Sequence, residues 1–117
     1  MRNRLLALAA ILLLAAPAHA TGGMRCATAR TPAIVVTLGF GHVAGSALFA
    51  QGLEVDGRQI AVAAPQWWLD DRELRVVLTD PQADEELAVV RATRKGATYD
   101  GTVTYRGKRH WIRCQES

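Results

Sequence analysis

Apolar and polar residues alternate over much of the chain, and this alternation predicts short β-strands separated by tight turns. Residues 98–114 read TYDGTVTYRGKRHWIRC, in which large apolar residues recur at every second position on either side of a glycine. A period of two is typical of a strand that buries one face. A dipeptide ending in glycine between two such segments is typical of a two-residue hairpin turn. Asp56-Gly57, Lys95-Gly96 and Arg106-Gly107 fit this description, so the pattern predicts three β-hairpins.

The last two turns fix registers that agree on which face is buried. A turn at Arg106-Gly107 pairs Val103 with His110 and Tyr99 with Cys114, and a turn at Lys95-Gly96 pairs Ala92 with Tyr99. A slip of one residue would move every side chain to the other face, so agreement between two turns is informative. The residues predicted to be buried are Ala88, Val90, Ala92, Tyr99, Val103, Ile112 and Cys114.

The same registers predict what lies beside this core. Arg91, Asp100 and Arg113 line up across three strands on the opposite face, which is a charge ladder with the acidic residue in the middle. Gly101 falls on the concave face, where the absence of a side chain lets a sheet curl.

Earlier segments alternate in the same way, as in residues 34–40, where Ile34, Val36, Leu38 and Phe40 share one face. We therefore predict an all-β fold: a small antiparallel barrel or a strongly curled sheet of seven to nine short strands, closed by a terminal disulfide. Closure or curling reduces the exposed edges that a short antiparallel sheet would otherwise present.

Residues 81–95 allow two interpretations. Asp80 as N-cap, Pro81 in the first turn and Gly96 beyond the end would suit a helix. Val89 and Val90 favour a strand, and so does the agreement of the two registers. We predict one helical turn near Pro81 followed by a strand.

The first 20 residues, MRNRLLALAAILLLAAPAHA, have the three-part pattern of a secretory signal peptide. The alternative, a permanent membrane anchor, needs about 20 apolar residues, and this apolar run is much shorter. We predict cleavage after Ala20, a single domain over residues 21–117, no transmembrane segment after cleavage, and a soluble periplasmic or secreted protein.

The two cysteines, Cys26 and Cys114, lie near opposite ends of the predicted mature domain. A redox motif needs cysteines close in sequence and a structural zinc site needs four ligands. With His42 and His110 as the only remaining histidines, the chain is poorly supplied for either. We predict a structural Cys26–Cys114 disulfide, which suits an oxidising compartment.

Charge is distributed unevenly along the chain. Two of the 14 Lys and Arg residues lie in the predicted leader, which leaves a net charge of about +1 against 11 Asp and Glu residues. Basic residues then gather toward the C-terminus: Arg91, Arg94, Lys95, Arg106, Lys108, Arg109 and Arg113. We predict that they act as one positive patch that adsorbs to anionic envelope surfaces; the alternative is a solvated basic face without such a role.

Motifs for catalysis or for a cofactor are missing from the sequence: it has no nucleophile elbow, HExxH, phosphate loop or dinucleotide fingerprint. Asp70-Asp71 could be a carboxylate pair, but a polar turn is the simpler reading. The glycine-rich residues 39–45 lack the lysine of a phosphate cradle. We predict a protein that is not an enzyme and that needs no cofactor, metal or nucleic acid.

Binding is the better prospect. Trp111 falls on the outer face between Arg109 and Arg113, and tryptophan and arginine dominate interface hot spots. The alternative is that a loop or the N-terminal residues cover Trp111. The candidate binding patch consists of Trp111, Arg109, Arg113, Arg91 and Lys108, with an envelope protein or anionic envelope surface as the partner. Of Trp67 and Trp68, one should be in the core and the other at the rim.

A signal peptide, antiparallel strands, a terminal cysteine and the run KGATYDGTVTYRGKRHWIRC together resemble the small periplasmic barrels of the C-type lysozyme inhibitor kind. The resemblance covers the last third best and implies a second function, inhibition of a cell-wall hydrolase. The family's Ser-Gly-x-x-Tyr signature is absent, because Gly45-Ser46 has the two residues in reverse order. Residues 39–46 would have to supply the inhibitory loop, with Gly41, His42 and Ser46 as candidate residues.

Overall fold

The structure is a computed structural model that describes residues 22–41 and 48–117. The predicted signal peptide and its cleavage site lie outside the described residues. The strands are β1 (Gly22–Ala27), β2 (Ile34–Phe40), β3 (Leu48–Val55), β4 (Arg58–Ile60), β5 (Ala63–Leu69), β6 (Glu73–Thr79), β7 (Glu86–Lys95), β8 (Thr98–Tyr105) and β9 (Lys108–Glu116).

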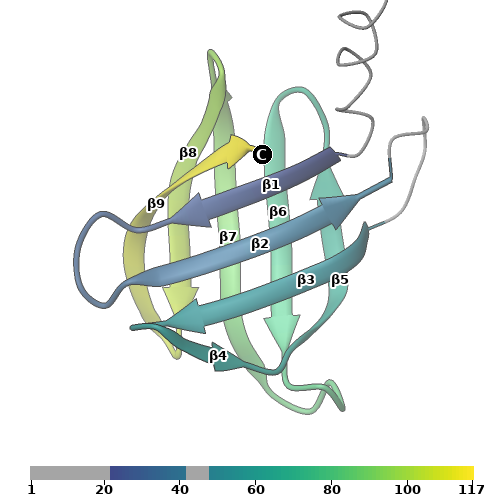
Figure 1. The fold of residues 1–117 in the computed structure, drawn as a ribbon, viewed down its shortest axis with the longest axis vertical. Helices are drawn as coiled ribbons and strands as arrows, with labels where there is room; N and C mark the ends of the chain where they lie inside the picture. Colours follow the sequence, from purple (N-terminus) through teal and green to yellow (C-terminus); the bar gives the residue numbers. More distant parts are fainter. Residues whose placement is uncertain (1–21, 42–47) are drawn as a thin grey trace, which may run out of the picture.

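All nine strands belong to one antiparallel sheet with the order β4-β3-β2-β1-β9-β8-β7-β6-β5. Every neighbouring pair is consecutive in sequence except β1 and β9. The sheet curls strongly, so that β1, β2 and β3 cross in front of β6, β7 and β8 (Figure 1). Strands β4 and β5 remain as its two edges. Of the two predicted closures, the strongly curled sheet is therefore the one that forms, as a half-barrel.

The core fills the concave side of this sheet. All seven residues predicted to be buried from the last two hairpins are buried, and Ile34, Val36, Leu38 and Phe40 join them from β2. Strand β6 adds Leu74, Val76 and Leu78, which are fully buried. Alternation thus identified the inward face correctly. No helix of the described residues is long and apolar enough to span a membrane.

Two of the three hairpin turns form as predicted. Asp56 and Gly57 have φ of 51° and 82°, and Arg106 and Gly107 have φ of 48° and 83°. Positive φ at both central residues is the signature of a type I′ turn, which matches the twist of the flanking strands. These turns set the observed pairing, with Leu53 opposite Ile60 and, as predicted, Tyr99 opposite Cys114.

The β7–β8 turn differs from the prediction by one position. Gly96 and Ala97 form the turn, and Lys95 pairs with Thr98. Of these two central residues only Gly96 has positive φ, so glycine stands first, as in a type II′ turn, and not second. The register consequently moves by two residues, which keeps every side chain on its predicted face.

This shift corrects the predicted charge ladder. In the β7–β8 pair, Arg91 lies opposite Thr102, and Asp100 lies opposite Thr93. In the β8–β9 pair, Asp100 lies opposite Arg113, as predicted. The three-strand ladder is therefore wrong, whereas its Asp100–Arg113 half is correct.

Residues between β6 and β7 form a loop stabilised by Asp80, and the helical alternative is wrong. The Asp80 carboxylate accepts hydrogen bonds from the backbone N–H groups of Gln82 and Glu85, at 3.2 and 2.5 Å. The Asp80 carbonyl accepts from Ala83 N–H at 2.9 Å, which makes a β-turn in place of the predicted helical turn near Pro81. Strand β7 then begins at Glu86.

The predicted disulfide is present. Cys26 and Cys114 lie directly opposite each other on β1 and β9, with Cα atoms 3.9 Å apart, and both are fully buried. The bond covalently fixes the one strand pair that is distant in sequence. A buried disulfide is compatible with an exported protein.

Candidate binding site around Trp111

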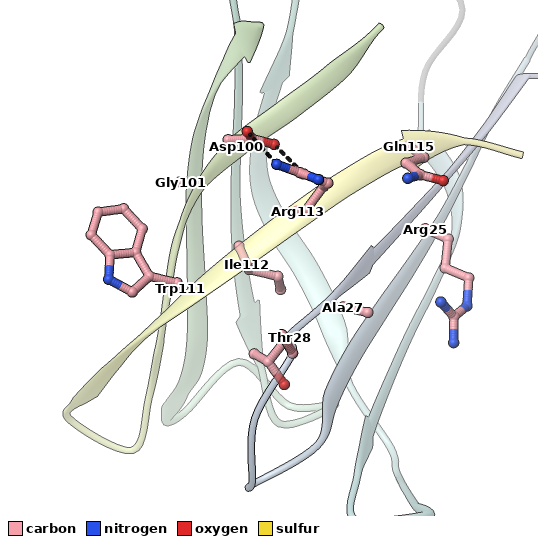
Figure 2. Close-up of a pocket in the computed structure, with 10 residues that line it drawn as sticks. Arg25, Ala27, Thr28, Asp100, Gly101, Trp111, Ile112, Arg113 and Gln115 are labelled. Carbon is pink, nitrogen blue, oxygen red and sulfur yellow. Dashed lines mark hydrogen bonds and ion pairs between the residues drawn. The ribbon is translucent and has the colours of Figure 1, made fainter.

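Trp111 projects from the outer face of β9 with 80 % of its surface exposed (Figure 2). It lies opposite Thr102 of β8, whereas Ile112 and Cys114 of the same strand are buried in the core. The strand pattern thus forces the indole outward. No segment of the described residues covers the indole. Within this part of the chain, Trp111 is therefore exposed, as the binding hypothesis requires, and is not covered by a loop.

A hollow of about 530 Å³ lies beside Trp111 on the outer side of β1, β8 and β9 (Figure 2). It is lined by Arg25, Ala27, Thr28, Ala29, Asp100, Gly101, Trp111, Ile112, Arg113 and Gln115. A second hollow, of about 440 Å³, shares Thr28, Ala29 and Trp111 and adds Arg30, Thr31, Arg109 and His110. The indole therefore stands between two hollows, which together we call the Trp111 groove.

The β1–β2 loop that borders the groove is held by hydrogen bonds. Thr28 Oγ1 accepts from Ile34 N–H and donates to the Pro32 carbonyl, both at 2.9 Å. Ala33 N–H donates to Asp56 Oδ1, and Asp56 N–H donates to the Ala33 carbonyl, both at 2.8 Å. These bonds tie the loop to the β3–β4 turn, so this wall of the groove is preorganised.

The groove is rich in positive charge. Arg113 donates two hydrogen bonds to Asp100, at 2.9 and 3.1 Å, and this contact lowers the pKa of the Asp100 carboxyl below its ordinary value. Arg25, Arg30 and Arg109 form no ion pair with any described residue. Four arginines against one carboxylate leave a surface that favours an anionic ligand.

The structure separates the basic residues that were predicted to form one patch. Lys95 lies at the β7–β8 turn and Lys108 at the β8–β9 turn, which are opposite ends of β8. Seven residue steps along β8 correspond to about 24 Å, and the Debye length at physiological salt is about 8 Å. The single patch is therefore wrong, because successive hairpins place their turns at alternate ends.

The five predicted patch residues are only partly brought together. Arg109 and Arg113 border the Trp111 groove. Arg91 shares the outer face but lies two strands away, and Lys108 alternates toward the other face. Arg25 was missed. Its signal was the cysteine pair, because a cross-strand Cys26–Cys114 bond places the residue before Cys26 beside Gln115 on the outer face.

Trp67 and Trp68 divide between core and rim, as expected. Trp67 packs its ring against Phe40, with centroids 5.4 Å apart. Trp68 is 49 % exposed on the outer face, and its Nε1 donates to Asp70 Oδ2 at 2.8 Å. The Arg75 guanidinium lies 5.8 Å from the centre of the Trp68 ring.

Asp70 is a turn residue, in line with the simpler reading of Asp70-Asp71. Its Oδ1 accepts from the N–H groups of Arg72 and Glu73, both at 2.8 Å. These bonds and the one from Trp68 lower the pKa of the Asp70 carboxyl, the bond from Arg72 N–H most of all. Its lone pairs are engaged in holding the β5–β6 turn.

This arrangement has a pH consequence. A carboxyl whose pKa is lowered on folding stabilises the protein above its unfolded pKa of about 4, and that contribution disappears as pH falls through the lower folded value. We expect the urea concentration at the unfolding midpoint of the parent to decrease as the pH is lowered below ~4. The midpoint of Asp70→Asn should decrease less over the same pH range. The matched control is Asp71→Asn, since the Asp71 side chain makes no hydrogen bond to a described residue. Equal acid sensitivity of parent and Asp70→Asn would contradict this role.

No group of three or more His, Cys, Asp or Glu side chains is placed to hold a metal ion in the residues that the structure describes. His110 is half-buried on the inward side of β9. Gly41 follows β2 and is half-buried, whereas His42 and Ser46 of the candidate inhibitory loop lie outside the described residues.

Comparison of the chain with known protein families, with curated proteins and with solved structures gives no match. The resemblance to C-type lysozyme inhibitors therefore stays a prediction. Fold alone does not carry a function, so the site itself must carry the functional argument.

Proposed function

We propose that this chain is an exported, non-enzymatic binding protein of the cell envelope, and that the Trp111 groove binds an anionic partner. The observation that carries the proposal is the 80 % exposure of Trp111 between two hollows lined by four arginines. A large exposed apolar side chain flanked by arginine-lined hollows has the composition of a binding hot spot.

Rigidity of the surroundings supports this assignment. Strands β1 and β9 are joined by the Cys26–Cys114 disulfide beneath the groove, and the β1–β2 loop is hydrogen-bonded to the β3–β4 turn. A preorganised site spends less binding free energy on ordering its own side chains and loops. The proposed export rests on the signal-peptide pattern of residues 1–20, with which the disulfide is compatible.

Deleting the indole tests the proposal. The probes are heparin, polygalacturonate and phosphatidylglycerol vesicles, titrated into the mature protein and followed by calorimetry. We expect at least one of them to bind, and Trp111→Ala to weaken that binding by about 1–2 kcal/mol, which is roughly 5- to 30-fold. The variant keeps the net charge, so the loss reports on the indole and not on general electrostatic attraction.

Phe49→Ala is the matched control, because Phe49 is also aromatic and 62 % exposed but lies on β3, away from the groove. It should bind like the parent. If none of the probes binds, or if Trp111→Ala binds as tightly as the parent, the groove does not have this function.

A further inference from the structure

A row of side chains on the outer face connects Trp111 to the second exposed tryptophan, Trp68. The ladder registers place each member directly opposite the next on five neighbouring strands. From β5 to β9 this outer-face row consists of Trp68, Arg75, Arg91, Thr102 and Trp111.

All members of the row point away from the core. Their inward neighbours along the strands, Val76, Val90 and Val103, are fully buried, and side chains alternate between the two faces of a strand. Strands lie about 4.8 Å apart, so four strand intervals separate the two indoles by about 19 Å along the sheet. The row is therefore a line with one exposed aromatic ring at each end.

The Trp68 side chain is held in one orientation by its neighbours. The hydrogen bond from its Nε1 to Asp70 and the guanidinium of Arg75 near its ring fix the indole. About half of its surface still faces solvent. A hollow of about 220 Å³ adjoins it and is shared with Arg75 and Arg91.

The centre of the row is positively charged. Arg91 forms no ion pair with any described residue, and Arg75 contacts Glu73 at 3.4 Å while both side chains stay 40–50 % exposed. An exposed pair of this kind is weak and does not prevent Arg75 from contacting an anion. The row thus combines two ring faces with two guanidinium groups spaced one strand apart.

We infer that the outer-face row is a track for an extended acidic polysaccharide, which rests on the proposed function because Trp111 belongs to both. The C–H face of a pyranose ring stacks on the electron-rich face of an indole, and a sugar carboxylate accepts paired hydrogen bonds from arginine. The spacing of the strands is close to the length of one sugar unit, so the row spans about four units. A small anion would contact only the central guanidinium groups and neither ring.

Single-stranded nucleic acid uses a similar combination of stacking and arginine contacts. The disulfide favours an oxidising compartment outside the cytosol, where acidic glycans are the more abundant linear polyanions. A charged membrane would be contacted by side chains that protrude together, whereas here the two rings stand at opposite ends of a line. Nucleic acid and membrane are therefore competing outcomes of the test.

The test is the dependence of affinity on chain length. A disaccharide, a tetrasaccharide and a hexasaccharide of galacturonic acid are titrated into the mature protein by calorimetry. We expect affinity to rise from the disaccharide to the tetrasaccharide and then to level off. Trp68→Ala should weaken hexasaccharide binding about fivefold and leave disaccharide binding unchanged, whereas Trp111→Ala should weaken both.

Arg91→Gln provides a second variant, at an exposed position where the change should not disturb folding. It should weaken hexasaccharide binding and reduce the salt dependence of that binding. Phe49→Ala and a neutral hexasaccharide, maltohexaose, are the controls. If galacturonate binding is sensitive to Trp111→Ala but is independent of length and of Trp68 and Arg91, the track is disproved and the groove function stands. Tighter binding of phosphatidylglycerol vesicles or of a deoxythymidine oligonucleotide than of the hexasaccharide would likewise overturn the polysaccharide assignment.

Discussion

Replacing both cysteines by alanine is expected to lower the free energy of unfolding by about 4–5 kcal/mol. The bond links residues that are 88 positions apart, and closing a loop of that length removes a correspondingly large conformational entropy from the unfolded chain. Domains of this size have net stabilities of about 5–15 kcal/mol, so the variant should be only marginally folded. Urea unfolding followed by far-UV circular dichroism measures the difference.

Reduction of the parent supplies the control for this experiment. Dithiothreitol should move the urea midpoint of the parent close to that of the Cys26→Ala/Cys114→Ala variant and leave the variant unchanged. A loss of less than about 1 kcal/mol in the variant would mean that the β1–β9 pair is held by its packing and hydrogen bonds alone, without a substantial contribution from the disulfide.

Gly101→Val is expected to destabilise the domain by about 3 kcal/mol or more. A Cβ atom at position 101 would overlap the carbonyl oxygen of Arg91 and lie 2.6 Å from the Cα atom of Ala92. Both are backbone atoms of β7, so no side-chain rotation relieves the clash, and the two strands must separate where the sheet curls. Gly101 is thus required by the close approach of β7 to β8.

Gly22→Ala is the matched control. A Cβ atom there would meet nothing closer than the Phe40 carbonyl oxygen at 3.7 Å, which is an ordinary contact. Its thermal midpoint should match that of the parent, whereas that of Gly101→Val should fall by more than 10 °C, on the order expected for a loss of this size in a domain of about 100 residues. Similar midpoints for the two variants would show that β8 can accommodate a side chain at position 101.

The inward face could be predicted because it depends only on alternation. Ala88, Val90 and Ala92 are buried whether the β7–β8 turn uses Lys95-Gly96 or Gly96-Ala97, since the two registers differ by two residues. The pairing of β7 with β8 could not be predicted, because glycine is accepted both as the second residue of a type I′ turn and as the first residue of a type II′ turn. Cross-strand charge pairs depend on this choice, and the ladder through Arg91 failed for that reason.

The candidate site was predicted as far as one strand could show it. The pattern of β9 alone shows that Trp111 is exposed and that two exposed arginines flank it. The alignment of Trp68 with Trp111 required the order of strands in the sheet, which sequence periodicity does not contain. Arg25 could have been placed from the predicted disulfide, which brings its strand beside β9. The single basic patch failed because closeness in sequence was equated with closeness in space, although successive turns of a meander lie at alternate ends.

The one non-consecutive pairing in the sheet determines the order in which the domain can be completed. Strands β1 to β4 form one set and strands β5 to β9 form another, and within each set every pairing joins strands that are consecutive in sequence. Each set can therefore form its hairpins as it is synthesised. Strand β1 is made first but has its β9 partner only when the last residues have emerged. The Cys26–Cys114 bond can therefore form only after β9 has been made, so it joins the two sets of strands last.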